Sequence, residues 1–171
     1  LLGHTDKVRE LLPAQMFRPA YDFCYTQRSF SSNGEILANR LTVREGQGAT
    51  GAQRLGNASA ALYLALVQSV PSSPAGPLTL RLFPSWPREW DAEFRLLCRG
   101  GYVVSCAMTD GEIGPITIEI RHGGSCRVRN PWPGKTVDLN VAGQSRSFEQ
   151  VGDLLTFDTA EGETLVLERS K

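Results

Sequence analysis

The sequence predicts an α+β chain in which helices and an irregular loop precede an antiparallel β-sandwich. An apolar helix pattern covers Ala58–Val70. After Pro77 the period changes, because apolar residues recur at every second position. Pairs of turn-forming residues then divide the remaining chain into eight short strands, which is typical of a sandwich. We therefore expect a helical part over residues 1–76 and a sandwich over residues 77–171.

Two helices are expected before the sandwich. The first covers Asp6–Leu12 and is limited by Pro13, which lacks a backbone donor. The second covers Ala58–Val70 with Asn57 as its N-cap, and apolar residues lie on almost every side of it. Such a helix must be buried all round, so we expect a region N-terminal to this chain to supply part of the burial. The Pro-rich stretch 71–77 is typical of a linker or tight crossover.

Eight strands are expected from the alternation of apolar and polar residues. Within 116–121, for example, three isoleucines alternate with Thr, Glu and Arg, so one face is apolar. The expected strands are Leu78–Phe83, Phe94–Arg99, Tyr102–Met108, Ile116–Arg121, Cys126–Arg129, Thr136–Val141, Leu154–Asp158 and Thr164–Glu168. The turn pairs between them are Gly100-Gly101, Asp110-Gly111, Gly123-Gly124, Pro133-Gly134, Ala142-Gly143 and Glu161-Gly162.

Charge and hydropathy argue against nucleic-acid and membrane partners. Eighteen Lys and Arg residues balance eighteen Asp and Glu residues, so no global field recruits nucleic acid or an anionic membrane. No run approaches the roughly 18 apolar residues that span a bilayer. The N-terminus lacks the charged and apolar regions of a signal peptide. Because the chain starts at Leu1 inside an apparent helix, we expect a fragment whose N-terminal region is missing.

The four cysteines do not predict a metal site or a disulfide. They show no CxxC pair and no Cys/His spacing. A hairpin about Gly100-Gly101 places Cys106 near Phe94, which separates it from Cys98 by roughly 10 Å along the ladder. That separation exceeds the limit of about 7 Å between disulfide Cα atoms. We therefore expect buried thiols, and neither a metal nor a cofactor.

Carboxylates are the remaining candidates for catalysis. The two histidines, His4 and His122, are expected at the surface, without a partner for nucleophilic catalysis. The irregular segment 13–57 contains Asp22, Glu35 and Glu45, and glycoside hydrolysis needs an acid and a base or nucleophile. Glu45 is the first candidate, because Arg44 can hold its charge and Gly46 lets a ligand approach. The alternative is a solvated glutamate paired with an arginine.

Aromatic residues offer candidate sugar-binding groups. Trp86 and Trp90 bracket Pro87 and could form a stacking platform for a sugar ring. The alternative is a pair that pins a long crossover to the sheet. Trp132 lies between two prolines and is expected to anchor a turn.

Four motifs resemble the C-terminal part of glycoside hydrolase family 95, the α-L-fucosidase-like enzymes. The order and spacing of the motifs are similar to those of the family from Leu82 to Arg129. The motifs are Leu82–Pro87, Arg99-Gly100-Gly101-Tyr102, Asp110–Ile113 and the stretch GGSCRVR at Gly123–Arg129. The resemblance implies the closing helices and loop of an (α/α)6 barrel, an incomplete catalytic domain, followed by the β-sandwich.

The resemblance also implies an activity for the intact parent. That activity is inverting hydrolysis of a glycosidic bond in a carbohydrate substrate, as in bacterial polysaccharide degradation, with the general acid in the missing region. This chain alone would not be catalytically competent. The alternative is a carbohydrate-binding or purely structural β-sandwich without catalysis, so the enzyme assignment stays open.

One position departs from the family pattern. The family's loop resembles Q-I-D-G-N, whose Asp acts in water activation, whereas this chain has Leu55 at that place in Gln53–Asn57. Leucine cannot act as a base. Either Glu45 or Asp22 has taken over that role, or the substrate differs, or the activity has been lost.

Overall fold

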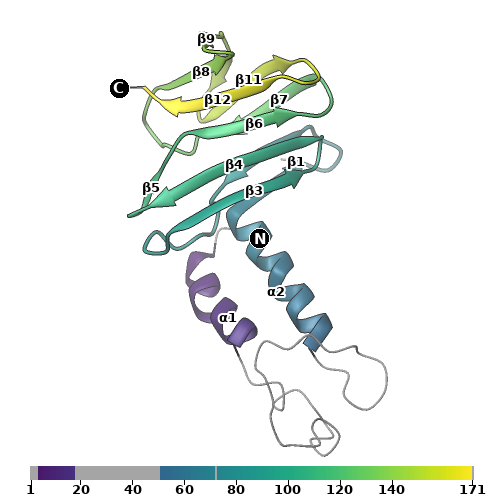
Figure 1. The fold of residues 1–171 in the computed structure, drawn as a ribbon, viewed down its shortest axis with the longest axis vertical. Helices are drawn as coiled ribbons and strands as arrows, with labels where there is room; N and C mark the ends of the chain where they lie inside the picture. Colours follow the sequence, from purple (N-terminus) through teal and green to yellow (C-terminus); the bar gives the residue numbers. More distant parts are fainter. Residues whose placement is uncertain (1–3, 18–50, 72, 171) are drawn as a thin grey trace, which may run out of the picture. The chain divides into compact units, whose positions relative to one another are not determined.

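The computed structural model describes residues 4–17, 51–71 and 73–170. They belong to two compact units, Leu1–Ala65 and Leu66–Lys171. Helices α1 (Thr5–Phe17) and α2 (Gly51–Leu66) precede the strands (Figure 1). Neither of these helices is long and apolar enough to cross a membrane.

Both helices differ in extent from the prediction. Helix α1 continues through Pro13 to Phe17, although an interior proline loses one hydrogen bond and crowds the carbonyl four residues before it, so the expected end of this helix was wrong. Helix α2 begins before Asn57, at Gly51, because residues 53–55 are good helix formers and an internal glycine costs only about 1 kcal/mol. It ends at Leu66 instead of Val70, so the expected bounds of this helix were wrong.

The residues after α2 form a strand. β1 (Val67–Pro71) pairs antiparallel with β2 (Leu78–Leu82). The Pro-rich stretch is therefore the turn of a hairpin, closed by a 2.9 Å bond from Gly76 N to Ser73 O, and not a linker between domains. The unit that holds the sheets begins at Leu66, earlier than the expected boundary at Pro77.

The strands form two sheets of a β-sandwich. One sheet has the order β1-β2-β7-β11-β10, and the other has the order β3-β4-β6-β12-β8-β9, with β5 paired to β4 (Figure 1). The remaining strands are β3 (Ala92–Cys98), β4 (Tyr102–Thr109), β5 (Glu112–Ile113), β6 (Ile116–Ile120), β7 (Gly124–Arg129), β8 (Val137–Val141), β9 (Gln144–Ser145), β10 (Glu149–Val151), β11 (Leu154–Thr159) and β12 (Thr164–Arg169).

All eight expected strands are present, with ends shifted by a residue or two. The pairing is antiparallel except between β2 and β7, which run parallel where Leu80 meets Val128. Strands β1, β5, β9 and β10 were missed. Three of these are short, and β1 is buried on both faces, so it has no alternation to detect.

The core lies between the inner faces of the two sheets. Alternate residues are buried in several of the strands, as in β6, where the three isoleucines are at most 2% exposed. Burying one aliphatic side chain of this size contributes about 1.5–3 kcal/mol. The fully buried aliphatic side chains come from both sheets and include Leu80, Val128, Leu155, Val104, Leu139, Leu165 and Leu167.

Candidate functional site

The four motifs between residues 82 and 129, or residues shortly after them, contact one another in two pairs although they are distant in sequence. The loop after β2 meets the β4–β5 turn, where Arg88 Nη1 donates to Gly111 O at 3.0 Å and Asp110 N donates to Asp91 Oδ1 at 2.9 Å. Asp110 and Gly111 have φ values of 51° and 77°, as this two-residue turn requires. The segment 88–91, which follows the first motif, is therefore hydrogen-bonded to the third motif.

The β3–β4 turn contacts the motif of β7. The Tyr102 hydroxyl donates to Ser125 O at 3.2 Å, and the Tyr102 ring is buried. Burial raises the pKa of Tyr102 to about 12, so the hydroxyl keeps its proton. On the other side of the turn, Ser69 Oγ donates to Arg99 O at 2.7 Å. The turn is thus held by β1 and by β7.

The tryptophan pair packs in a geometry that differs from a flat platform. The rings of Trp86 and Trp90 meet edge to face, with centroids 5.5 Å apart and planes at 76°. Trp86 Nε1 donates to Trp90 O at 2.8 Å, and both residues are half-buried. The hydrogen bond and the crossed rings close the loop on itself. The predicted sugar-binding role of this pair stays a prediction.

Trp132 is a buried anchor of the turn after β7. Its Nε1 donates to Ile113 O at 3.0 Å, and its backbone N donates to Asn130 Oδ1 at 2.9 Å. Asn130 is also buried and donates from Nδ2 to Lys135 O at 3.0 Å. Each polar group in this cluster therefore has a hydrogen bond, as buried polar atoms require.

Cys98, Cys106 and Cys126 are buried free thiols, as the sequence predicts. Phe94 lies opposite Cys106 and Tyr102 lies opposite Cys98, which confirms the expected register. Burial raises the pKa of the Cys106 and Cys126 thiols to about 12, so both stay protonated near neutral pH. These thiols pack in the core and are unsuited to nucleophilic chemistry. Cys24 lies outside the described residues.

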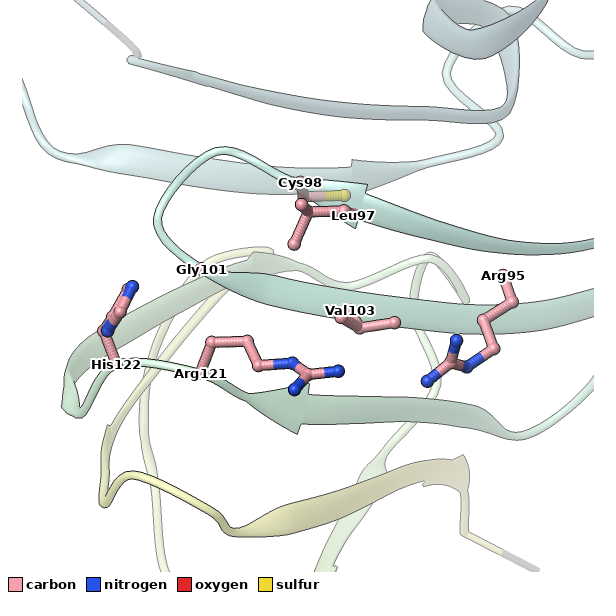
Figure 2. Close-up of a pocket in the computed structure, with 7 residues that line it drawn as sticks. All are labelled: Arg95, Leu97, Cys98, Gly101, Val103, Arg121 and His122. Atoms are coloured by element: carbon pink, nitrogen blue, oxygen red, sulfur yellow. The ribbon is translucent and has the colours of Figure 1, made fainter.

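A shallow cavity of about 710 Å³ lies on the outer face of β3 and β4, beside the residues that directly follow β6. We call it the outer-face cavity. Its lining includes Arg95, Leu97, Gly101, Val103, Arg121 and His122 (Figure 2). A second depression of about 490 Å³ continues along the same strands and shares Arg95 with it.

Strand register sets the positions of the side chains in this cavity. Leu97 lies opposite Val103 in the β3–β4 ladder, and Val103 lies opposite Glu119 in the β4–β6 ladder. The cavity ends at Gly101, whose φ of +77° suits the turn. A Cβ on Gly101 would lie 2.6 Å from His122 Cδ2, so the glycine also makes room for the histidine ring.

The two arginines of the cavity differ in their ion pairing. Arg95 donates from Nε and Nη2 to Glu119 Oε1 at 3.1 and 2.9 Å, and Nη2 also reaches Glu119 Oε2 at 2.9 Å. Arg121 is exposed, and within the described part of the chain its guanidinium has no hydrogen bond or ion pair. The arrangement therefore presents one cation with unused donors, beside apolar side chains.

The predicted catalytic residues are not placed. Asp22, Arg44 and Glu45 lie outside the described residues. Leu55 lies within α2, and its side chain is not described. Both histidines are exposed, as expected. Sequence reasoning assigned Arg121 only to a strand and missed its cavity, because the other lining residues come mainly from β3, β4 and the turn between them.

Among residues 4–17, 51–71 and 73–170, no group of three His, Cys, Asp or Glu side chains could hold a metal ion.

No protein-family model matches the chain. No curated protein matches it either. The chain is similar to a solved family 39 glycoside hydrolase from the gut symbiont Bacteroides cellulosilyticus WH2, at 17% identity and a TM-score of 0.38. That match covers 51% of this chain and 18% of the other.

Proposed function

We propose that this chain is the C-terminal part of a family 95-like glycoside hydrolase, with the sandwich as its structural accessory domain. The observation that carries the proposal is the motif string from Leu82 to Arg129. Its members resemble the family in order and spacing, and distant parts of the string contact one another here. Tyr102 donates to Ser125, and Arg88, which follows the first motif, donates to Gly111.

The roles of the motif residues support a structural domain. Gly100, Gly101 and Gly111 have positive φ values in tight turns, and Cys126 is buried in the core. None of these groups is suited to acid–base or nucleophilic catalysis. Hydrolysis in the intact parent would therefore depend on the helical part, where α1 and α2 would be the closing helices of an (α/α)6 barrel.

Glu45 and Asp22 are the candidate bases of that hydrolysis, with Arg44 holding the charge of Glu45. Leu55 replaces the Asp that the resemblance places in water activation. An inverting mechanism needs one carboxylate to activate water and one carboxylic acid to protonate the leaving oxygen. The acid would come from the region N-terminal to Leu1.

The test is hydrolysis by the intact parent protein on aryl α-L-fucosides and a panel of glycans. We expect turnover that falls at least 100-fold in Glu45→Gln if Glu45 is the base, since general-base catalysis contributes about 10²–10⁴-fold. The same assay on Asp22→Asn examines the second candidate. Glu35→Gln, in the same segment, is the matched control and should keep the parent rate. No turnover on any glycoside would remove the enzyme proposal.

Carbohydrate binding by the sandwich is the second candidate function, and the outer-face cavity favours it. Binding of the full chain to a glycan array tests which of two sites is used, the Trp86–Trp90 pair or the outer-face cavity. A signal that disappears in Trp90→Ala would assign binding to the Trp86–Trp90 pair. Because these rings are crossed and hydrogen-bonded within their loop, we expect the array signal not to depend on Trp90.

A further inference from the structure

The outer-face cavity combines a cation that has unused donors with an apolar floor. The Arg121 guanidinium is without a hydrogen-bonding or ionic partner among the residues that the structure describes, whereas the Arg95 guanidinium is held by Glu119. Figure 2 shows the two guanidinium groups turned toward each other, with Val103 beside the space between them. A ligand at this place meets one net positive charge and the planar donors of Arg121.

The apolar part of the cavity consists of Leu97 and Val103, which lie opposite each other across the β3–β4 ladder. Leu97 is 65% exposed, and it is one of the few large apolar side chains at this level of exposure among the described residues. An exposed leucine gains when a ligand covers it. The C–H face of a pyranose ring is a suitable cover, since it is apolar while the ring edge remains polar.

The apolar floor of the site is rigid because it is built on paired strands. Leu97, Val103 and Glu119 are fixed in register across three adjacent strands. At the end of the cavity, the ring of His122 packs over Gly101, where a Cβ would come within 2.6 Å of it. Groups on strands are held in place better than groups on loops, so the apolar floor is in place before a ligand binds. Arg121 directly follows β6 and is tied to the β3–β4 turn by a 2.8 Å bond from its backbone N to Gly101 O.

We propose that the outer-face cavity binds a carboxylate-bearing sugar, a hexuronate residue of an acidic glycan. The carboxylate would accept two parallel bonds from the Arg121 guanidinium, whose fork matches it. The ring face would cover Leu97 and Val103, and His122 would exchange hydrogen bonds with a ring hydroxyl. Glu119 does not oppose the ligand strongly, because Arg95 offsets its charge. The choice of a sugar over another carboxylate rests on the proposed function.

The test is titration of the full chain with digalacturonate, followed by NMR at the Leu97 and Val103 methyl groups and by calorimetry. We expect saturable binding that weakens at least tenfold in Arg121→Gln and in Arg121→Lys, which keeps the charge but loses the fork. The matched control is Arg129→Gln, which removes the same charge from the opposite sheet, where Arg129 Nε pairs with Asp153 Oδ2 at 3.0 Å. Its affinity should stay within twofold.

Several outcomes would overturn the proposal. They are the absence of saturable shifts with digalacturonate, equal loss in Arg121→Gln and Arg129→Gln, and equal binding of neutral galactose. Acetate binding as tightly as digalacturonate would remove the role of the ring face. The binding assay does not depend on hydrolysis. If the intact parent protein hydrolyses glycans but this chain does not bind uronates, only the proposed site is refuted. Uronate binding with an inactive parent refutes only the enzyme proposal.

Discussion

Some turn glycines in the motif-bearing half of the sandwich (residues 78–135) are used differently from those in its C-terminal half (residues 136–170). In the motif-bearing half, a Cβ on Gly100 would lie 2.6 Å from Cε2 of the buried Tyr102 ring, and one on Gly101 would lie as close to His122. In the C-terminal half, Gly143, Gly152 and Gly162 also have positive φ values, but a Cβ there would meet nothing within 4 Å. Gly100 and Gly101 therefore serve both the turn and the packing, whereas the other three, like Gly124 and Gly134 in the motif-bearing half, serve the backbone conformation alone.

This difference explains why a motif can identify a fold without performing chemistry. Turns in the motif-bearing half are packed against other segments, as in the hydrogen bond from Ser69 Oγ to Arg99 O. Residue types there are limited by backbone angle and by neighbours together. A recognisable string such as Arg99–Tyr102 therefore reports on packing, while the exposed side chains beside it are free to bind a ligand.

The largest expected effect comes from removing β1, which supports the motif-bearing half. A chain that starts at Leu66 should melt cooperatively, whereas a chain that starts at Pro77 should be unfolded or aggregated. The shorter chain lacks the fully buried Val67, five paired residues of β2 lose their partners, and Arg99 O loses Ser69. These losses approach the total stability of a small domain, which is about 5–15 kcal/mol.

Thermal melts monitored by circular dichroism compare the two truncated chains. Equal melting temperatures would show that β1 is only an appendage to the sheet. The full chain provides the reference for both.

Trp132→Ala is expected to cost about 3–5 kcal/mol, the usual range for a buried aromatic residue. It removes a side chain that is 6% exposed and leaves Ile113 O without its donor. Trp132→Phe keeps most of the ring and should cost about 1–3 kcal/mol, mainly from the unpaired carbonyl. Phe148→Ala in the C-terminal half is the control, and it should cost less because Phe148 is only half-buried.

Urea denaturation of the three variants measures these free energies of unfolding. If Phe148→Ala destabilised the chain more than Trp132→Ala, the motif-bearing half would not be the more tightly packed one.

The sequence predicted the strands well wherever one face is exposed, because alternation then marks each residue as inward or outward. β6 is the clearest case, with three buried isoleucines between half-buried polar residues. β1 was missed because Val67, Gln68 and Ser69 are all buried, so the segment continues the apolar pattern of α2. Local pattern cannot separate a helix from a strand that is covered on both sides.

The candidate site was harder to predict than the fold. Turn glycines were found from their dipeptides, but the packing of His122 on Gly101 depends on the pairing of β4 with β6. The cavity around Arg121 needs the same long-range register, which no local signal contains. The predicted carboxylates, Asp22 and Glu45, lie outside the described residues and stay predictions.

A comparison of Gly100→Ala with Gly143→Ala measures how much packing adds to the cost of substituting a turn glycine in the motif-bearing half. Both glycines have positive φ values, +93° and +79°, so each substitution carries backbone strain of about 1–2 kcal/mol. Gly100→Ala also displaces the buried Tyr102 ring, which adds about 1–3 kcal/mol of overpacking. We expect about 3 kcal/mol for Gly100→Ala and less than 2 kcal/mol for Gly143→Ala, measured by urea denaturation. Equal costs would contradict the packed turn.

The smallest expected effect belongs to the C-terminal half, where Arg146 and Glu163 form a two-bond ion pair at 2.8 and 2.7 Å. The hydrogen bonds from Arg146, helped by the backbone N–H of Ala160, lower the pKa of Glu163 from 4.5 to about 2. A carboxyl whose folded pKa is depressed stabilises the fold above its unfolded pKa. That contribution decreases as the pH falls from about 4.5 to about 2.

Arg146→Gln should therefore lower the melting temperature slightly at pH 7 and reduce the further loss between pH 4.5 and pH 2.5. Thermal melts of the unsubstituted chain and of the variant at both pH values measure this difference. Arg129→Gln is the matched control, because it removes the same charge but leaves the Arg146–Glu163 pair intact, so it should keep the acid dependence of the parent. An unchanged acid dependence in Arg146→Gln would mean that this pair, unlike the packed turns of the motif-bearing half, adds nothing to the stability of the folded state.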